Sequence, residues 1–99
     1  MIASNIPLAT IPKESIPSLR FGASDVISDP TERRKRLASA TRAAVLGNGY
    51  RSKVDITFQT ADGQIQRVST TIWAFDQDYV LLKSSTAIPL RCILNIESC

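Results

Sequence analysis

Apolar and polar residues alternate strictly between residues 53 and 59. Val54, Ile56 and Phe58 are each followed by a polar residue. A period of two residues is typical of a strand that buries one face, because successive side chains point to opposite sides. We therefore expect a half-buried strand over this stretch.

The sequence "TADGQ" follows and indicates a hairpin, whose loop length can be inferred from the register. A two-residue loop would place Ile56 opposite Ser69, whereas a three-residue loop over residues 61–63 places it opposite Val68. Apolar side chains pair better with one another, so the longer loop is favoured. Such a loop is a type I turn with Gly63 in a left-handed conformation at a G1 bulge.

The next strand is predicted over residues 64–75, which is long for a strand. Its last part is apolar on both faces, with Ile72 and Ala74 on one and Trp73 and Phe75 on the other. This pattern is expected of a bent strand that contributes to two sides of a small barrel. It favours a structural role for Trp73, although an exposed binding surface remains the alternative.

The rest of the chain predicts short elements separated by turns. They are a turn at Asp76–Asp78, a strand over residues 79–83, a turn at "SSTA", a strand over 87–88, one helical turn over 89–92 and a last strand over 93–97. The expected fold is mainly β: a small five-stranded SH3-like or Sm-like barrel with one N-terminal helix and an extended, Pro-containing arm.

A helix start precedes the strands. Asp29 can cap free backbone amides, Pro30 suits the first helical position, and Glu32 completes a capping box. We expect the helix to run over residues 30–46 and to end at the glycines of "GNG". Its apolar side is a narrow stripe of mostly small residues that can lie closely on a sheet: Leu37, Ala40, Thr41, Ala44 and Val45.

Residues 1–28 are predicted to form an extended or disordered arm, and residues 29–99 a single helix-plus-barrel domain. The arm repeats Ile-Pro at five-residue intervals, at Ile6, Ile11 and Ile16. Proline removes backbone donors and keeps the preceding residue extended. Such an arm is mobile unless it docks on the domain, and docking is the alternative.

Charge is concentrated at the start of the helix. The net charge is only +3, but four of the twelve basic residues are consecutive: Arg33, Arg34, Lys35 and Arg36. Such a run is usually a solvated helix face, while a nucleic-acid footprint is the more specific alternative. Nearby Asp25, Asp29 and Glu32 can offset part of the unfavourable interaction with the helix dipole.

The residue types argue against catalysis. The chain has no histidine, no Gly-rich phosphate loop and only two cysteines, Cys92 and Cys99. We interpret these as one buried and one terminal thiol, and expect no metal, cofactor or enzymatic activity. Asp76 and Asp78 are interpreted as turn formers rather than an acid/base pair. No long apolar run and no secretory signal is seen, so we expect no membrane association and a cytoplasmic location.

The helix-plus-strands order and the stretch "FDQDYVLLK" resemble the Sm-like family, in particular its bacterial Hfq branch of RNA chaperones, in which the equivalent stretch reads FDQFVILLK. The likeness covers residues 30–97. The pattern "TTIWAFDQDYVLLK…IPLRCILNI" within it also resembles a group of small bacterial proteins without an assigned function. The chain departs from the family where its bent strand carries Ser69, Thr70 and Thr71 instead of glycine, and where "LRCIL" replaces the closing signature.

The resemblance implies a non-catalytic module that binds single-stranded RNA. Asp76 would shape the RNA-facing turn, Gln77 would contact a base, and Arg91 would meet phosphate, with Arg33–Arg36 adding phosphate contacts. The base-stacking aromatic of the family falls at Asp78, so Tyr79 replaces it only with a one-residue shift. A protein-interaction or assembly role without nucleic acid is the alternative.

The small size of the predicted barrel bears on assembly. A domain of about 60 residues buries only about 60% of its unfolded surface and needs additional packing. Edge strands can gain that packing by joining copies of the chain into a homo-oligomer or by docking the chain's own arm. The sequence leaves both alternatives open.

Overall fold

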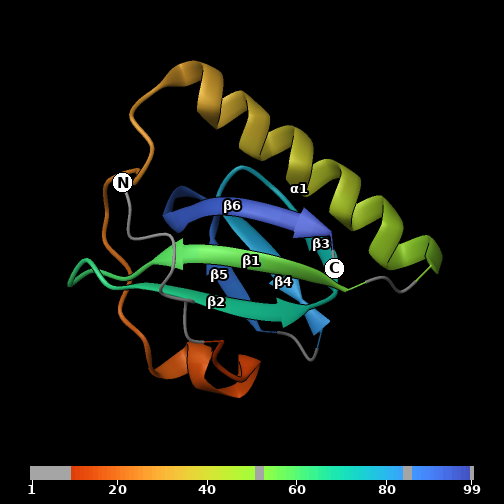
Figure 1. Cartoon of the computed structure of the whole chain (residues 1–99), viewed down its shortest axis with the longest axis horizontal. Helices are drawn as coiled ribbons and strands as arrows, with labels where there is room; N and C mark the ends of the chain where they lie inside the picture. Colours follow the sequence, from red (N-terminus) through yellow and green to blue (C-terminus); the bar gives the residue numbers. More distant parts are fainter. Residues whose placement is uncertain (1–9, 51–52, 84–85, 99) are drawn as a thin grey trace, which may run out of the picture.

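The computed structural model describes residues 10–50, 53–83 and 86–98. Over these residues the fold is mainly β, with six strands in two three-stranded antiparallel sheets and one long helix, α1 (Pro30–Tyr50) (Figure 1). The first sheet has the order β2 (Ile65–Thr70), β1 (Val54–Gln59) and β6 (Ile93–Ser98). The second has the order β3 (Ile72–Phe75), β4 (Tyr79–Leu82) and β5 (Ala87–Pro89).

The hairpin between β1 and β2 has the predicted three-residue loop. Ile56 pairs with Val68 and Val54 pairs with Thr70. Gly63 has a φ of 87°, and its N–H donates to the carbonyl oxygen of Thr60 at 3.0 Å. The predicted register and the left-handed glycine are both confirmed, because only this loop length places the buried face of β1 opposite the buried face of β2.

The predicted long strand is divided in two. The chain leaves the first sheet at Thr70 and enters the second at Ile72, so six strands replace the expected five. Among the described residues the two sheets do not join into a closed barrel. The remaining elements follow the prediction: β4, β5, a 3-10 turn η3 (Leu90–Cys92) and β6. The "SSTA" turn lies partly outside the described residues.

A register shift between Ile72 and Ala74 corrects the predicted faces of β3. Ala74 was expected to share a face with Ile72, but Ile72 is buried and Ala74 is exposed, while Phe75 packs against the core. An irregularity of this kind interrupts the alternation of side chains and exchanges the two faces beyond it. Trp73 is 41% exposed, which agrees with the alternative of an exposed side chain rather than with a core position.

Helix α1 begins as predicted and continues further than predicted. The carboxylate of Asp29 accepts a hydrogen bond from the N–H of Thr31 at 2.9 Å, which caps the first turn. The helix passes through Gly47 and Gly49 to Tyr50 instead of ending at Leu46. The low helix propensity of glycine only weakly constrains where a helix ends. The position at which the chain must enter β1 is a stronger constraint.

The buried side of α1 differs from the predicted stripe. Ala40 and Ala44 are buried as expected, but Leu37, Thr41 and Val45 are exposed. Ala43 and Arg36 complete the buried side instead. The helix contacts β3 and β6, and small side chains permit this close approach.

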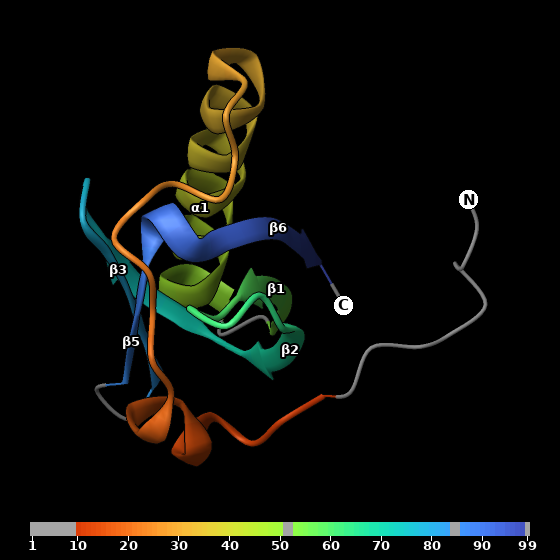
Figure 2. The same cartoon turned by 90° about the vertical axis from the view of Figure 1, so that its left-hand side faces the viewer.

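The arm is ordered over its described part and docks on the sheets. Residues 13–18 form a 3-10 helix, η1 (Lys13–Ser18), and Ile16 within it is only 1% exposed. The N–H of Ile11 donates to the carbonyl oxygen of Arg67 on the outer edge of β2 at 2.8 Å. Figure 2 shows the segment between η1 and α1 running along one side of the molecule, past the second sheet. The docked alternative therefore describes residues 10–28, whereas Ile6 lies outside the described residues.

One apolar core joins the arm, the helix and both sheets. It contains Phe58 at its centre, with the tilted ring of Phe21 from the arm 6.0 Å away. The largest fully buried side chains of the described residues are the following: Ile16, Val54, Ile56, Phe58, Val68, Ile72, Val80, Leu82, Ile88, Cys92 and Ile93. The arm and the two sheets consequently share a single core.

Candidate nucleic-acid interface

The basic start of α1 lies beside the turn between β3 and β4. An open groove of about 240 Å³ separates them. Its lining residues come from three elements that are distant in sequence: Arg33, Arg34, Arg36 and Leu37 from α1, Gln77 from the turn, and Leu90 from η3. We call this feature the α1–turn groove. It brings together four of the residues that the sequence predicted to contact RNA.

The turn is held in one conformation by its own backbone and by Asp76. One carboxylate oxygen of Asp76 accepts the N–H groups of Asp78 and Tyr79, both at 2.8 Å. These hydrogen bonds, from Tyr79 first and then Asp78, lower the pKa of Asp76 below its usual value. The carbonyl oxygen of Asp78 accepts the N–H of Leu90 at 2.9 Å, which joins the turn to η3. Gln77 is therefore presented from a fixed backbone.

The side chain of Gln77 is exposed and has no hydrogen-bond partner among the described residues. Leu37 across the groove is 43% exposed, and Leu90 below is nearly buried. A carboxamide carries both a donor and an acceptor, and the two leucines supply an apolar surface next to it. This part of the groove can accommodate a flat group with hydrogen-bonding edges.

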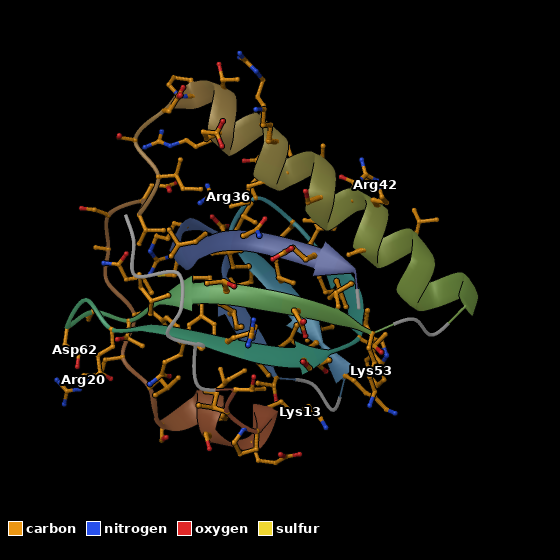
Figure 3. All side chains as sticks on the ribbon, viewed as in Figure 1. Lys13, Arg20, Arg36, Arg42, Lys53 and Asp62 are labelled. Atoms are coloured by element: carbon orange, nitrogen blue, oxygen red, sulfur yellow. The ribbon has the colours of Figure 1, made fainter. Side chains whose placement is uncertain are left out.

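Arg36 lies in the interior, although it also lines the groove. It is 6% exposed, and its terminal nitrogens donate to the two carboxylate oxygens of Asp25 at 2.9 and 2.7 Å. One of them also donates to the carbonyl oxygen of Ile93 at 3.0 Å. Figure 3 shows this side chain between the first half of α1 and β6. Arg36 therefore anchors the arm, and because its charge is compensated by Asp25 it is not free to bind a phosphate.

Asp25 is the matching anion, and sequence reasoning gave it only a minor role. Burial opposes its ionisation, but the hydrogen bonds from Arg36 and the backbone of Ile27, together with the charges of Arg36 and Arg33, outweigh burial and lower its pKa. Asp25 comes eleven residues before Arg36. The sequence does show an acidic residue shortly before the basic run. Helical spacing, however, predicts ion pairs only three or four residues apart, so it does not predict a pair eleven residues apart.

The other predicted site residues lie outside the lining of the groove. Lys35 is exposed and pairs with Glu32 at 3.2 Å. Tyr79, 49% exposed, begins β4. Arg91 is half-buried on η3, where its Nε donates to the carbonyl oxygen of Gly22 at 2.7 Å and so anchors the arm.

The predicted site residues line neither of two other hollows that the described residues form. One of about 320 Å³ lies between Arg20 of the arm and Asp62 of the β1–β2 hairpin, which Figure 3 shows at the same end of the molecule. The other, of about 270 Å³, lies between Arg42 of α1 and Glu97 of β6. Arg33 and Arg34, the two exposed arginines that line the α1–turn groove, line neither of these hollows.

Two kinds of feature are absent from the described residues. No group of three or more His, Cys, Asp or Glu side chains is arranged there to hold a metal ion. In the same part of the chain, no helix is both long and apolar enough to cross a membrane. Cys92 is a buried free thiol, and burial raises its pKa, while Cys99 lies outside the described residues.

Comparisons with known proteins add no relative to this description. Models of known protein families, curated proteins and solved structures were each searched with the chain, and none of the three searches returned a match.

Proposed function

We propose that the chain is a non-catalytic module that binds single-stranded RNA in the α1–turn groove. The observation that carries the proposal is the convergence of Arg33 and Arg34 with Gln77 across one groove. Phosphate requires cationic donors, and sequence-tolerant binding of single strands requires a surface that accepts an unstacked base. The groove supplies both within the span of one cavity.

The charges on the two walls give the bound strand an orientation. The helix wall carries Arg33 and Arg34. The turn that supplies Gln77 to the other wall also contains Asp76 and Asp78, which adjoin Gln77 in sequence but do not line the groove. Phosphate is attracted to the first wall and repelled by the carboxylates beside the second. The backbone of the strand therefore follows α1, and a base points toward Gln77 and Leu37.

The same orientation explains the preference for a single strand. A base in a duplex is stacked and paired, so it cannot reach the carboxamide of Gln77 while its phosphate contacts α1. An unpaired base can rotate away from its neighbours at a cost of a few kcal/mol or less. We expect duplex RNA to bind weakly through phosphate contacts alone.

The proposed architecture is an Sm-like barrel that carries this groove on its outside. The order of the elements supports it: a helix, a hairpin, a strand that passes from one sheet to the other at Thr71, and a 3-10 turn before the last strand. The edge of β2 is partly covered by the chain's own arm at Arg67. This contact favours arm docking at that edge over pairing with another copy there.

A titration of labelled single-stranded RNA followed by fluorescence polarisation tests the function. The test variant is Arg33→Glu/Arg34→Glu. The matched control is Arg20→Glu/Arg42→Glu, which makes the same change in net charge at two exposed residues outside the groove. We expect the test variant to lose binding and the control to retain most of it.

The salt dependence supplies an independent criterion. Each phosphate neutralised on a single strand contributes about 0.7 to the slope of log K against log salt, so losing two contacts lowers the slope by about 1.4. Equal losses of affinity in the test and control variants would show that RNA is attracted to the positive charge of the chain in general. This result would contradict a site in the groove.

Exposed aromatic residues favour a second candidate, a protein-interaction module. Tyr79 lies on the outer face of the second sheet, and Trp73 on β3 is 41% exposed. Leu81 pairs across the strands with Ala74 on one side and with Ala87 on the other. These three residues share the outer face with Tyr79. If this surface self-associates, light scattering will detect a dimer that Trp73→Ala/Tyr79→Ala dissociates. A wild-type chain that stays monomeric at high concentration would exclude self-association.

A further inference from the structure

Arg33 is anchored by one of its three side-chain nitrogens. Its Nε donates to the carbonyl oxygen of Ile27 at 2.6 Å and lies 3.4 Å from a carboxylate oxygen of Asp25. The two terminal nitrogens have no partner among the described residues, and the side chain remains 47% exposed. The guanidinium group is thus held at its inner end, and its outer end is free in the groove.

The anchor itself is rigid. Asp25 binds both terminal nitrogens of Arg36 and accepts the N–H of Ile27 at 2.8 Å. Arg36 is in turn fixed on the carbonyl oxygen of Ile93. The side chain of Arg36 is 5% exposed and that of Asp25 is 19% exposed. A pair enclosed to this degree keeps one geometry, because separating the two charges would leave both without compensation.

The neighbouring cations have no comparable anchor. A terminal nitrogen of Arg34 lies 3.5 Å from the hydroxyl of Thr31, at the limit of a hydrogen bond, and Lys35 pairs with Glu32 at 3.2 Å. Both contacts are within α1 and exposed to solvent, where such interactions contribute little. Arg33 is the one member of the basic run that another segment holds while its terminal nitrogens stay free, among the described residues.

We propose that Asp25 and Ile27 are positioning residues, which hold Arg33 so that its two terminal nitrogens bind two oxygens of a single RNA phosphate. The proposal rests on the RNA-binding function and goes beyond it by assigning unequal roles within the basic run. An arginine whose fork is already oriented loses less conformational entropy on binding, and its planar shape matches a phosphate. Arg33 is then the principal phosphate ligand, and Arg34 contributes charge.

Lysine substitutions at the two adjacent arginines test this assignment in the full chain. Arg33→Lys and Arg34→Lys both keep the positive charge, so simple electrostatic attraction predicts no difference between them. Oriented binding predicts that Arg33→Lys weakens binding of the labelled single-stranded RNA about five- to tenfold, because lysine has neither the anchored Nε nor the fork. Arg34→Lys should stay within about twofold of the wild type, with an unchanged salt slope in both variants.

Asp25→Asn gives a second readout, in which two explanations predict opposite signs. Asp25 places a negative charge beside two arginines of the groove, so if it acted only through that charge, its removal would strengthen RNA binding. As a positioning residue it should weaken binding when removed, in spite of the gain in net positive charge. Circular dichroism establishes whether this variant is folded at the temperature of the titration. If it is not folded, the comparison of Arg33→Lys with Arg34→Lys decides whether Arg33 is the oriented phosphate ligand.

The outcomes separate this proposal from the function on which it rests. A wild-type chain that fails to bind RNA at low salt contradicts both. A wild-type chain that binds, together with equal affinities for Arg33→Lys and Arg34→Lys, contradicts the assignment of Arg33 alone. A selective loss in Arg33→Lys supports the assignment.

Discussion

The pairing of Asp25 with Arg36 shows how one residue outside a predicted element can decide which side of that element is buried. The helical spacing of the apolar residues predicted that Leu37 lies on the buried side of α1 and Arg36 on the outside. The structure reverses them, with Arg36 6% and Leu37 43% exposed. A buried guanidinium is tolerated only when a carboxylate and a carbonyl compensate it, and both partners come from other segments. Sequence periodicity contains no information about such partners.

This pairing predicts a loss of stability in acid. The pKa of Asp25 is lower in the folded chain than its ordinary value of 3.8. The unfolded chain therefore binds a proton more readily, so the stabilisation is fully present above that ordinary value and is lost as the pH falls toward the lower folded pKa. Urea unfolding of the wild type between pH 6 and pH 2.5 should show this decline.

Asp25→Asn is the corresponding variant, and its free energy of unfolding should be about 3 kcal/mol lower at neutral pH because Arg36 loses its charged partner. Below the ordinary pKa of an aspartate, the difference between the variant and the wild type should shrink, since protonation removes the same charge in the wild type. A difference that stays constant with pH would contradict an ionised Asp25 in the folded state.

At the scale of elements, the β1–β2 hairpin could be predicted and the contacts of α1 could not. Local alternation decides the hairpin register, because Ile56 and Val68 are separated by one short loop. The bulge in β3 and the exposure of Trp73 arise where the chain passes between two sheets, and no local pattern marks that passage. The helix start was predicted from Asp29 because capping is also a local interaction.

The close packing of α1 makes a prediction at two alanines of the same helix. Ala40 is 0% exposed, whereas Ala38 is exposed. Ala40→Leu should lower the free energy of unfolding by about 1–3 kcal/mol, because extra methylene groups do not fit between the helix and the sheets. Ala38→Leu has the same helix propensity change and should be within about 0.5 kcal/mol of the wild type. Equal effects in thermal unfolding would mean that this side of α1 is not packed.

At the scale of the whole molecule, the arm belongs to the folded domain. Ile16 lies in the core that both sheets share, and the arm forms backbone hydrogen bonds with β2, with the β1–β2 hairpin and with η3. The prolines of the arm predicted an extended or disordered segment, because proline removes backbone donors and keeps the preceding residue extended. The gap that receives Ile16 exists only once the sheets have formed, so the docked alternative could be stated from sequence but not selected.

Because Ile16 of the arm lies in the shared core, we expect a substitution there to lower the stability of the whole domain. Ile16→Ala should lower the free energy of unfolding by about 2–4 kcal/mol, as expected for a cavity in the core. Ile65→Ala removes the same atoms from a side chain that is 46% exposed and should cost about 1 kcal/mol or less. Urea unfolding followed by tryptophan fluorescence measures both. Similar costs for the two variants would indicate an arm that is not part of the core.

The candidate site is likewise a property of the whole molecule. The basic run and the "FDQ" turn were each singled out in the sequence, but they are more than 40 residues apart by number, from Arg33 to Gln77. Their meeting across the α1–turn groove depends on how α1 crosses the sheets. Sequence reasoning gave the residue types and missed the geometry, since Leu37, Leu90 and Asp25 entered the site only through the fold.

The most direct test of the central claim is a map of the bound surface. Amide signals of the ¹⁵N-labelled full chain are recorded by NMR while an unlabelled single-stranded RNA is added at low salt. The groove predicts the largest shifts at Leu37, Gln77 and Leu90, with little change at Asp62 and Gly63 of the β1–β2 hairpin, which do not line it. Figure 3 shows Asp62 well away from Arg36. Shifts centred on the hairpin, or no shifts at all, would contradict RNA binding in the α1–turn groove.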